Sequence, residues 1–284
     1  MVAGGFDDSV EALNGKNETC NIPNLSDPIS ESPSVFQHGS DIIFCGGWSN
    51  YQNCLKLQNN SWASYNKMTK ARNDATALTV NGDEYIFGGR RSSKTSQILK
   101  RNSNVWEKGP KIPKGLVQSC SVKITDNELL FIGSSSTKKI LKYDLKTRRW
   151  NKITNKKHRN NPSCIYFKSK IIVTGGEVLD YNNYIVSSNT TDVIEIGKNG
   201  SLSIRKVGDL NVARHSHGIG IINVHKIATV IVFGGNTGYN NQPLHSVEAW
   251  NDATEKWTLL PNLRLKKSNS QFGFTQVPTR LLCK

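Results

Sequence analysis

Two histidines and two arginines have types and spacing that could support chemistry in this sequence. His215 and His217 flank a single serine, so both imidazoles would point to one side of an extended strand, as metal ligands can. No Asp, Glu or Cys lies close by in the sequence to supply a third ligand. We therefore expect a structural role for these histidines, with no metal and no cofactor.

Arg90 and Arg91 directly follow one glycine pair, and Trp48 follows another. A guanidinium can hold a carboxylate through two parallel hydrogen bonds, and an indole offers a flat surface for stacking. No Gly-x-Ser-x-Gly motif, phosphate-binding loop or paired-cysteine zinc spacing accompanies these residues. The sequence therefore predicts a binding protein and not an enzyme.

The chain is basic, with 37 Lys and Arg against 22 Asp and Glu and a formal net charge of +15. The densest cluster runs from Lys146 to Arg159, where we expect a solvated surface, with an anionic partner as the alternative. No nucleic-acid-binding motif accompanies the charge, and no apolar run approaches the length of about 18 residues that a membrane span requires. We expect a globular monomer that binds no nucleic acid and does not insert into a membrane.

The elements that would position the candidate residues recur along the chain. Glycine pairs end short apolar runs every 42 to 45 residues or so, as in propeller blades, apart from one interval that is about 15 residues longer. The six positions are Gly5, Gly47, Gly89, Ser134, Gly176 and Gly235. A strand follows each, and in four repeats a tryptophan comes next: Trp62, Trp106, Trp150 and Trp257. Four short strands per repeat make one blade of an all-β propeller.

This repeat resembles that of the kelch family, in which an apolar strand ends in Gly-Gly and is followed by a strand, a tryptophan and a small residue before arginine. The last feature occurs in MTKAR from Met68 and in LNVAR from Leu210. Cys20 and Ile204 depart from the pattern by replacing tryptophan, and Ser134 replaces a glycine. The resemblance implies a six-bladed kelch β-propeller with four-stranded blades, formed by residues 1–284 as a single domain.

Both ends of the chain bear on how such a propeller would close. The sequence begins at the end of a Gly-Gly strand and finishes with one spare strand from Phe272. We expect the C-terminal strand to complete the first blade, because that join would pair the open edges of the sheet. Since residues 1–3 are too few for a full strand, we also expect the natural chain to extend upstream of Met1.

Antiparallel strands place the loop after each Gly-Gly pair and the loop before each innermost strand on one face, here called the loop face. In kelch proteins such loops hold peptide ligands, and the resemblance carries this role to matching positions; the alternative for each is an exposed residue without a partner. The longest loop, 177–191, also has the aromatic, Asn and Ser composition of binding loops. The candidate ligand-binding residues are Trp48, Asn73, Arg90, Arg91, Ser119, Ser135, Ser163, Glu177, Tyr181, Tyr184, His215 and Asn236.

The pairing of the cysteines indicates in which cellular compartment the protein works. Cys45 and Cys54 lie on neighbouring strands, and we predict that they are close enough to bridge; Cys120 and Cys164, on successive inner strands, could also pair, with buried free thiols as the alternative. Cys20 and Cys283 would belong to the closing blade. The pattern resembles secreted invertebrate kelch proteins, which implies an extracellular, disulfide-bonded glycoprotein. The glycosylation sequons at Asn17, Asn24, Asn59, Asn189 and Asn199 match chance in number and add little.

Three functions stay open on the sequence. The favoured one is a non-catalytic binding module that recognises a protein or glycan partner on the loop face. The second is an intracellular kelch adaptor, either a ubiquitin-ligase substrate receptor or an actin-binding protein, whose BTB region lies outside this sequence. The third is a galactose-oxidase-like enzyme, although its copper site of tyrosines and histidines around a cysteine-modified tyrosine cannot be placed here.

Overall fold

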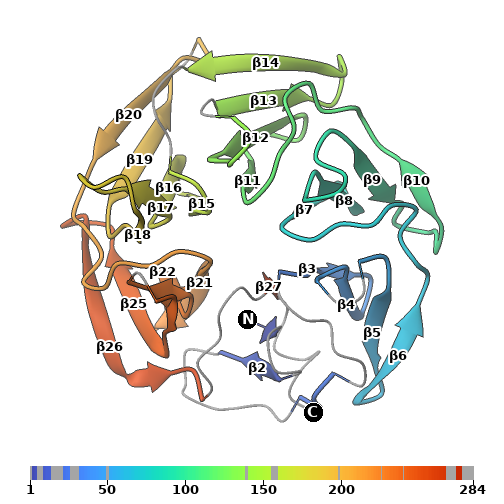
Figure 1. Cartoon of the computed structure of the whole chain (residues 1–284), viewed down its shortest axis with the longest axis horizontal. Coiled ribbons are helices and arrows are strands. Elements are labelled where there is room, and N and C mark those ends of the chain that lie inside the picture. Colours follow the sequence, from blue (N-terminus) through green and yellow to red (C-terminus); the bar gives the residue numbers. More distant parts are fainter. Residues whose placement is uncertain are drawn as a thin grey trace. The chain divides into compact units, whose positions relative to one another are not determined.

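The structure is a computed structural model that describes residues 2–4, 9–13, 22–25, 32–48, 51–137, 140–154, 159–197, 199–224, 226–238, 240–266 and 273–276. The chain divides into two compact units, unit 1 with residues 1–118 and 271–284, and unit 2 with residues 119–270. Within the described ranges the regular elements are β-strands, without a helix, and every strand pair is antiparallel (Figure 1).

Unit 1 contains two four-stranded sheets and one three-stranded sheet. Blade 1 has β3 (Ser34–His38), β4 (Asp41–Cys45), β5 (Cys54–Gln58) and β6 (Ser61–Tyr65). Blade 2 has β7 (Thr76–Val80), β8 (Asp83–Phe87), β9 (Ser96–Leu99) and β10 (Trp106–Lys108). The third sheet has the order β2 (Val10–Ala12), β1 (Val2–Gly4) and β27 (Gly273–Thr275), so segments from both ends of the chain pair within this unit.

Unit 2 contains three four-stranded sheets. Blade 3 has β11 (Cys120–Lys123), β12 (Glu128–Ile132), β13 (Ile140–Asp144) and β14 (Arg149–Thr154). Blade 4 has β15 (Ser163–Phe167), β16 (Lys170–Thr174), β19 (Thr191–Ile196) and β20 (Leu202–Lys206), with a separate hairpin of β17 (Glu177–Leu179) and β18 (Ile185–Ser187). Blade 5 has β21 (Gly218–Val224), β22 (Ile227–Phe233), β25 (Ser246–Asn251) and β26 (Lys256–Arg264), with the short pair β23 (Asn236–Thr237) and β24 (Gln242–Pro243).

The described residues therefore form five four-stranded blades and not the predicted six. The first repeat in the sequence, which precedes blade 1, forms the three-stranded sheet β2–β1–β27. The segment around Cys20 that would supply a fourth strand lies outside the described residues. The predicted pairing of the C-terminal segment with the first repeat is present as the contact of β27 with β1, where Ala3 faces Phe274.

The second strand of each blade forms the core, as its apolar run predicts. In β4, β8, β12, β16 and β22 the last four residues are all buried. These strands lie between two neighbours of the same sheet, so both of their edges are hydrogen-bonded, and the burial of consecutive residues shows that both of their faces are covered as well. Each run ends at the loop face, where a glycine pair follows it, or Gly133–Ser134 in the case of β12.

Gly88 shows why the run must end in glycine. Its φ is 67°, and a Cβ at this position would collide with the carbonyl oxygen of Leu116. The next residue, Gly89, donates its backbone N–H to that carbonyl at 2.8 Å. The glycine pair therefore lets the end of β8 bond directly to the loop that precedes the next blade, an approach that a side chain would prevent.

Three of the outer-strand tryptophans, Trp62, Trp106 and Trp257, contact the preceding repeat. Trp106 packs edge-to-face on Phe36 of the preceding blade, with ring centroids 6.0 Å apart, and its indole N–H donates to the carbonyl of Asn66. Trp62 donates to the carbonyl of Pro23, and Trp257 donates to the hydroxyl of Thr191. In these three repeats the indole therefore packs against, or donates a hydrogen bond to, a neighbouring repeat.

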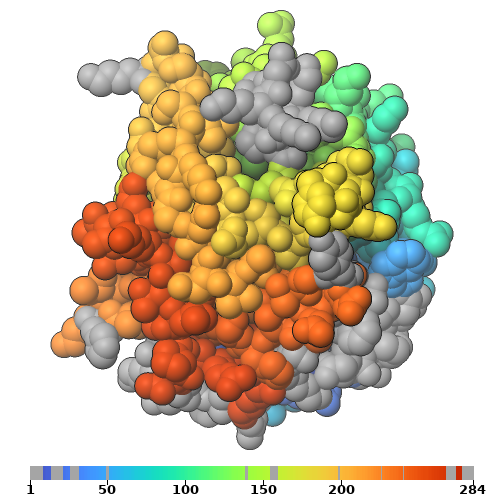
Figure 2. Space-filling view, turned by 60° about the vertical axis from the view of Figure 1, so that its left-hand side comes forward, coloured from blue at the N-terminus to red at the C-terminus, as the bar shows by residue number. Residues whose placement is uncertain are grey.

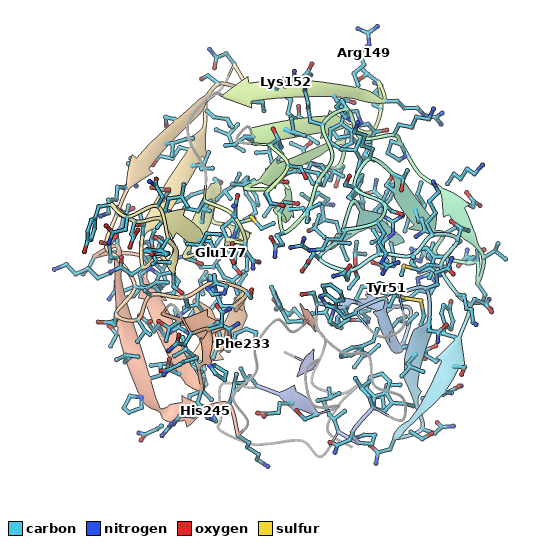
Figure 3. All side chains as sticks on the ribbon, viewed as in Figure 1. Tyr51, Arg149, Lys152, Glu177, Phe233 and His245 are labelled. Atoms are coloured by element: carbon cyan, nitrogen blue, oxygen red, sulfur yellow. A yellow bond between two sulfur atoms is a disulfide. The ribbon has the colours of Figure 1, made fainter. Side chains whose placement is uncertain are left out.

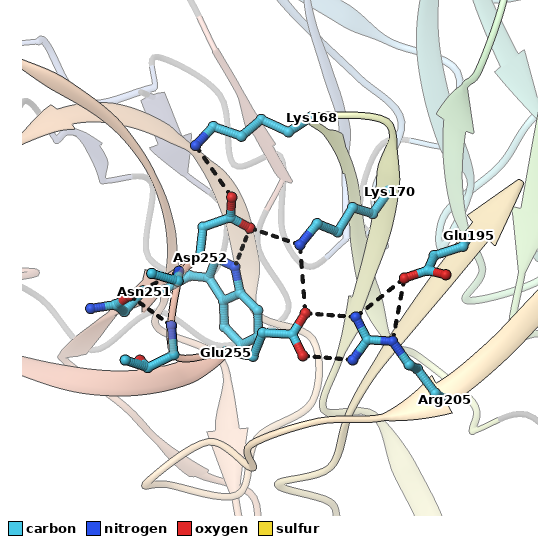
Figure 4. Close-up of polar contacts among 10 residues, drawn as sticks. Lys168, Lys170, Glu195, Arg205, Asn251, Asp252 and Glu255 are labelled. Atoms are coloured by element: carbon cyan, nitrogen blue, oxygen red, sulfur yellow. Dashed lines mark hydrogen bonds and ion pairs between the residues drawn. The ribbon is translucent and has the colours of Figure 1, made fainter.

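At the end of the blades opposite the loop face, blades 4 and 5 of unit 2 share a network of ion pairs (Figure 4). Both terminal nitrogens of Arg205 reach the Glu255 carboxylate at 2.6 Å, and Glu195 holds the same guanidinium at 3.2 Å. Lys170 contacts both Asp252 and Glu255. Glu195, Asp252 and Glu255 are thus paired with the protein's own cations.

Nowhere in the described part of the chain is there a helix with the length and apolar character needed to cross a membrane.

Candidate functional site

The loops on the loop face meet each other within each unit, as the antiparallel order of the strands predicts. Isolated backbone bridges join Asn73 to Arg90 in unit 1, and Asn160 to Glu177 and His215 to Asn236 in unit 2. Each bridge links a loop after a glycine pair with a loop before an innermost strand. Within each unit the backbones of these loops are therefore joined to each other on the loop face.

Arg90 is fixed by an ion pair with Asp74. The Nε atom of Arg90 donates to Oδ2 of Asp74 at 2.6 Å. The Asp74 side chain is only 8% exposed, whereas that of Arg90 is 49% exposed. A largely buried carboxylate thus orients an exposed guanidinium through Nε, and this contact does not use the two terminal nitrogens.

Arg91 is held differently, by stacking on an aromatic ring. Its guanidinium carbon lies 3.8 Å from the centroid of the Tyr51 ring. Tyr51 is labelled in Figure 3. Arg91 has a φ of 67°, in the left-handed region that residues other than glycine rarely adopt. The Tyr51 ring also lies 6.2 Å from the indole of Trp48, which is 47% exposed. Trp48, Tyr51, Arg90 and Arg91 are together called the loop cluster below.

A disulfide and two hydrogen bonds shape the loop that carries Trp48 and Tyr51. Cys45 and Cys54 face each other on β4 and β5 and are bonded, with their Cα atoms 4.1 Å apart, which confirms the predicted bridge. The carbonyl of Tyr51 accepts the backbone N–H of Arg72 at 2.9 Å, and that of Gln52 accepts the N–H of Met68 at the same distance. The loop is therefore closed at its base and bonded along one side.

Arg72 lies beneath this surface as a buried cation. Its side chain donates to the carbonyl of Gly88 at 2.6 Å and to that of Thr95 at 3.1 Å, and no ion pair with a carboxylate forms within the described residues. Desolvation lowers the pKa of Arg72 to about 10, so the guanidinium stays charged at neutral pH. Unit 1 therefore holds a positive charge just below the loop that carries Arg90 and Arg91.

In unit 2 the equivalent arginine has a carboxylate partner. Arg214 is also fully buried, but it forms an ion pair of 2.8 Å with the fully buried Glu248. Both oxygens of Glu248 also accept backbone N–H groups, from Asn211 and Val212. In unit 1 the neutral Gln97 takes this place and accepts the N–H groups of Thr69 and Lys70.

His215 is buried on the loop face of unit 2, where it contacts other polar side chains. Ser187 Oγ lies 3.0 Å from Nδ1 of His215, whose Nε2 lies 3.7 Å from a carboxylate oxygen of Glu177. Burial lowers the pKa of His215 to about 4, so the ring is neutral and a weak base at physiological pH. The group therefore fits a structural role better than general-base chemistry.

His217 points into a different environment from His215. Its Nε2 lies 2.8 Å from the hydroxyl of Thr174, and complete burial, together with the charge of Arg214, lowers its pKa well below the usual value. The prediction that both imidazoles share one side of a strand is wrong, because Ser216 has a φ of 51° and β21 begins only at Gly218. Among the described residues no group of three or more His, Cys, Asp or Glu side chains is placed to hold a metal ion.

The predicted loop 177–191 is in part a hairpin, β17–β18, which lies in the yellow segment on the surface in Figure 2. Asp180 orders its tip, because one carboxylate oxygen accepts the backbone N–H groups of both Asn182 and Tyr184 at 2.9 Å. Tyr181 is 93% exposed and Tyr184 is 62% exposed. The two strands of this hairpin were not predicted from the sequence. Their exposed positions include apolar residues, so the alternation of polar and apolar residues that indicates a strand is missing.

The candidate residues differ in what they offer to a partner. Six are exposed: Trp48, Arg90, Arg91, Ser135, Tyr181 and Tyr184. Ser119 and Glu177 are half-buried, and four have side chains buried in the protein: Asn73, Ser163, His215 and Asn236. Three neighbours in contact with candidates were not singled out from the sequence, namely Tyr51, Asp74 and Ser187, since their contacts with Arg91, Arg90 and His215 join segments that are distant in the sequence.

The other predicted cysteine pairs have separate outcomes. Cys120 and Cys164 form a disulfide with their Cα atoms 5.7 Å apart, linking the inner strands β11 and β15 of blades 3 and 4. Cys20 and Cys283 lie outside the described residues, as do Phe272, the sequon at Asn17 and the lysines 156 and 157 of the basic cluster. The described sequon asparagines, Asn24, Asn59, Asn189 and Asn199, are exposed.

Known proteins match this chain in repeat and in fold. The Kelch motif model matches residues 229–264, which include most of β22 and all of β25 and β26. A RING finger domain and kelch repeat-containing protein of Dictyostelium discoideum is 23% identical over 218 residues, 75% of this chain and 20% of that protein. The chain thus spans about a fifth of the length of this curated relative.

Among solved structures, one described as the structure of YjhT has a TM-score of 0.70 at 14% identity, over 85% of this chain and 86% of that one. A likeness at that identity concerns the fold. Together with the four-stranded antiparallel blades, the Gly-Gly strands and the outer tryptophans, these matches show a β-propeller fold with a Kelch motif at residues 229–264 and support the kelch-repeat family.

Proposed function

We propose that this protein is a non-catalytic binding module that holds a macromolecular partner on its loop face, with the loop cluster of unit 1 as the main contact. The observation that supports the proposal is that two consecutive residues each have their guanidinium fixed by a different neighbour, Arg90 by Asp74 and Arg91 by Tyr51. Groups that are already ordered lose less entropy on binding, so such an arrangement favours recognition of an anionic group.

The proposal extends to the whole chain. We take residues 1–284 as one propeller domain of six blades, in which the β1–β27 pairing belongs to the closing blade. The disulfides Cys45–Cys54 and Cys120–Cys164 support an oxidising, extracellular compartment, because such bonds are rare in the cytosol. N-glycans on the exposed sequons would fit that compartment.

A kelch adaptor is the second candidate. The observation in its favour is the Dictyostelium relative, whose name combines kelch repeats with a RING finger domain and of which this chain covers a fifth. The full-length sequence decides between the two candidates. A signal peptide ahead of the propeller supports the secreted module, whereas a BTB or RING region supports the adaptor.

Two double substitutions test the binding face. We expect Arg90→Ala with Arg91→Ala to weaken binding about 10- to 100-fold, since partly desolvated charge contacts contribute more than solvated ones. Ligands are first selected on the wild-type protein from a peptide library and a glycan array and are then titrated against each variant.

The matched control is Arg148→Ala with Arg149→Ala in the basic cluster, which removes the same charge from exposed residues. Arg148 has a φ of 57°, close to that of Arg91, so the backbone effects of the two double variants are also matched. Arg149 extends from β14 (Figure 3). The proposal predicts a loss below about threefold for this control. An equal or larger loss, with binding that collapses steeply as salt rises, would mean that diffuse charge holds the ligand and that the chosen face is wrong.

A further inference from the structure

We infer that the loop cluster takes an anionic polysaccharide, with a sugar ring resting on Trp48 and its carboxylate or sulfate group held by Arg90 and Arg91. The inference rests on the proposed binding function and names its ligand class. It combines three features of unit 1: open guanidinium donors, an exposed indole, and a local excess of positive charge.

The first feature is the supply of unused donors. Asp74 accepts only the Nε–H group of Arg90. Tyr51 contacts Arg91 by stacking its ring on the guanidinium, so this contact uses none of the N–H groups, which lie in the plane of the guanidinium. A planar guanidinium presents its donors in a fork that matches the oxygens of a carboxylate or sulfate. Both forks are held before a ligand arrives.

The second feature is the exposed indole of Trp48, which lies beside the Tyr51 ring on which Arg91 stacks. The C–H groups on one face of a sugar ring pack well on an aromatic face, whereas an acidic peptide side chain has no ring to place there. Arg91 covers one face of the Tyr51 ring, so that face is not open to a ligand. Proteins that bind single-stranded nucleic acid usually stack successive bases on several aromatic rings, and one open indole favours a sugar over a run of bases.

The third feature is an excess of positive charge around the cluster. Arg72 lies buried beneath the carbonyl of Gly88, two residues before Arg90, and Gln97 gives it no opposite charge. The nearest acid on the loop, Asp74, is already paired with Arg90. The chain as a whole carries +15. These charges favour a polymer with repeated anionic groups over a neutral glycan.

Direct titration of purified protein tests the inference with four probes at matched charge: a heparin oligosaccharide, a hyaluronan oligosaccharide, poly-L-glutamate and single-stranded oligothymidylate. Hyaluronan carries carboxylates alone and heparin also carries sulfates, so these two arms distinguish the sources of the anion. We expect at least one of the two oligosaccharides to bind about tenfold or more tightly than poly-L-glutamate and oligothymidylate.

Three variants then locate the binding site. Arg91→Lys keeps the charge but loses the planar fork and the stack on Tyr51, so we expect a loss of about tenfold, against less than twofold for the matched Arg149→Lys. Trp48→Ala should lower the affinity about fivefold or more without changing its dependence on salt, because no charge is removed.

The outcomes separate the ligand class from the proposed function. If poly-L-glutamate binds best and Arg91→Lys abolishes its binding, the loop cluster is a binding site but the polysaccharide is wrong. If oligothymidylate binds as tightly as the oligosaccharides, or if Trp48→Ala changes nothing, the inference is overturned in favour of charge alone. Absence of binding by every probe also overturns it, while the proposed function is then decided by its own library selection.

Discussion

Glu248→Gln should destabilise unit 2 by about 3 to 5 kcal/mol, the range found when one partner of a buried ion pair is removed. Both side chains of the Arg214–Glu248 pair are fully buried, with 2.8 Å between them. The substitution would leave Arg214 charged inside the protein with carbonyl and hydroxyl partners alone. The amide of glutamine can replace the carboxylate in size but not in charge.

Unit 1 provides the converse experiment, because it already contains the state that this substitution creates. Gln97 occupies the place of Glu248, and Arg72 is buried without a carboxylate. Gln97→Glu should therefore stabilise unit 1, by about 1 kcal/mol or more, since the desolvation of Arg72 has already occurred.

Urea unfolding at neutral pH measures both effects as shifts of the midpoint in opposite directions. Glu195→Gln is the control, because its half-exposed carboxylate should contribute less than about 1 kcal/mol. If Glu248→Gln costs no more than Glu195→Gln, then the buried pair contributes nothing to unit 2 beyond what an amide supplies.

The second large effect is the pH dependence of unit 1, which we expect to be set by Glu84. This carboxyl group on β8 is 1% exposed, and desolvation raises its pKa from 4.5 to about 7, although the hydroxyl of Thr79 donates to it at 2.6 Å. The folded state thus holds the proton more tightly than the unfolded state does. The contribution to stability is full below pH 4.5, falls as the pH rises, and is lost above about pH 7.

A pKa that rises from 4.5 to about 7 corresponds to a loss of about 3 kcal/mol across this interval. Glu84→Gln should remove the loss and make the protein more stable than wild type at pH 8, with little difference at pH 4.5. Thermal unfolding of both proteins between pH 4.5 and 8 checks this. Parallel profiles for the two proteins would show that Glu84 ionises normally in the folded state.

The histidines of unit 2 act in the opposite direction. His215 and His217 are buried as neutral rings with lowered pKa values, so they contribute stability above about pH 6.5 that is lost as the pH falls. This loss should remain in the Glu84→Gln protein, which separates the two contributions.

Much of the fold was predictable because its causes are local and repeated. The Gly88–Gly89 pair reflects a close backbone approach that only glycine permits, and Trp106 fills a gap between blades, so both leave a mark at the same place in other repeats. The disulfide Cys45–Cys54 was predictable for the same reason, since the register of two adjacent strands places the cysteines opposite each other. The described residues do not form the predicted sixth four-stranded blade, and the segment around Cys20 from which a further strand was expected lies outside them.

The site was predictable only in outline. The strand order indicated which loops share a face, but the contact of Arg90 with Asp74 joins residues 16 apart, and that of Arg91 with Tyr51 joins different repeats. The burial of His215 and Asn236 was also invisible in the sequence, because polar residues in loops are usually exposed. Contacts between loops depend on the packing of whole blades, which no single repeat encodes.

Hydrogen–deuterium exchange of unit 1, with and without the selected ligand, tests the binding face most directly. The account predicts that the ligand slows exchange in the loops that carry the cluster, at residues 46–53 and 88–95, and leaves the hairpin turns at the other end of the same blades, Asn59–Asn60 and Asn81–Gly82, unchanged. Protection at those turns, with unchanged exchange in the two loops, would contradict it.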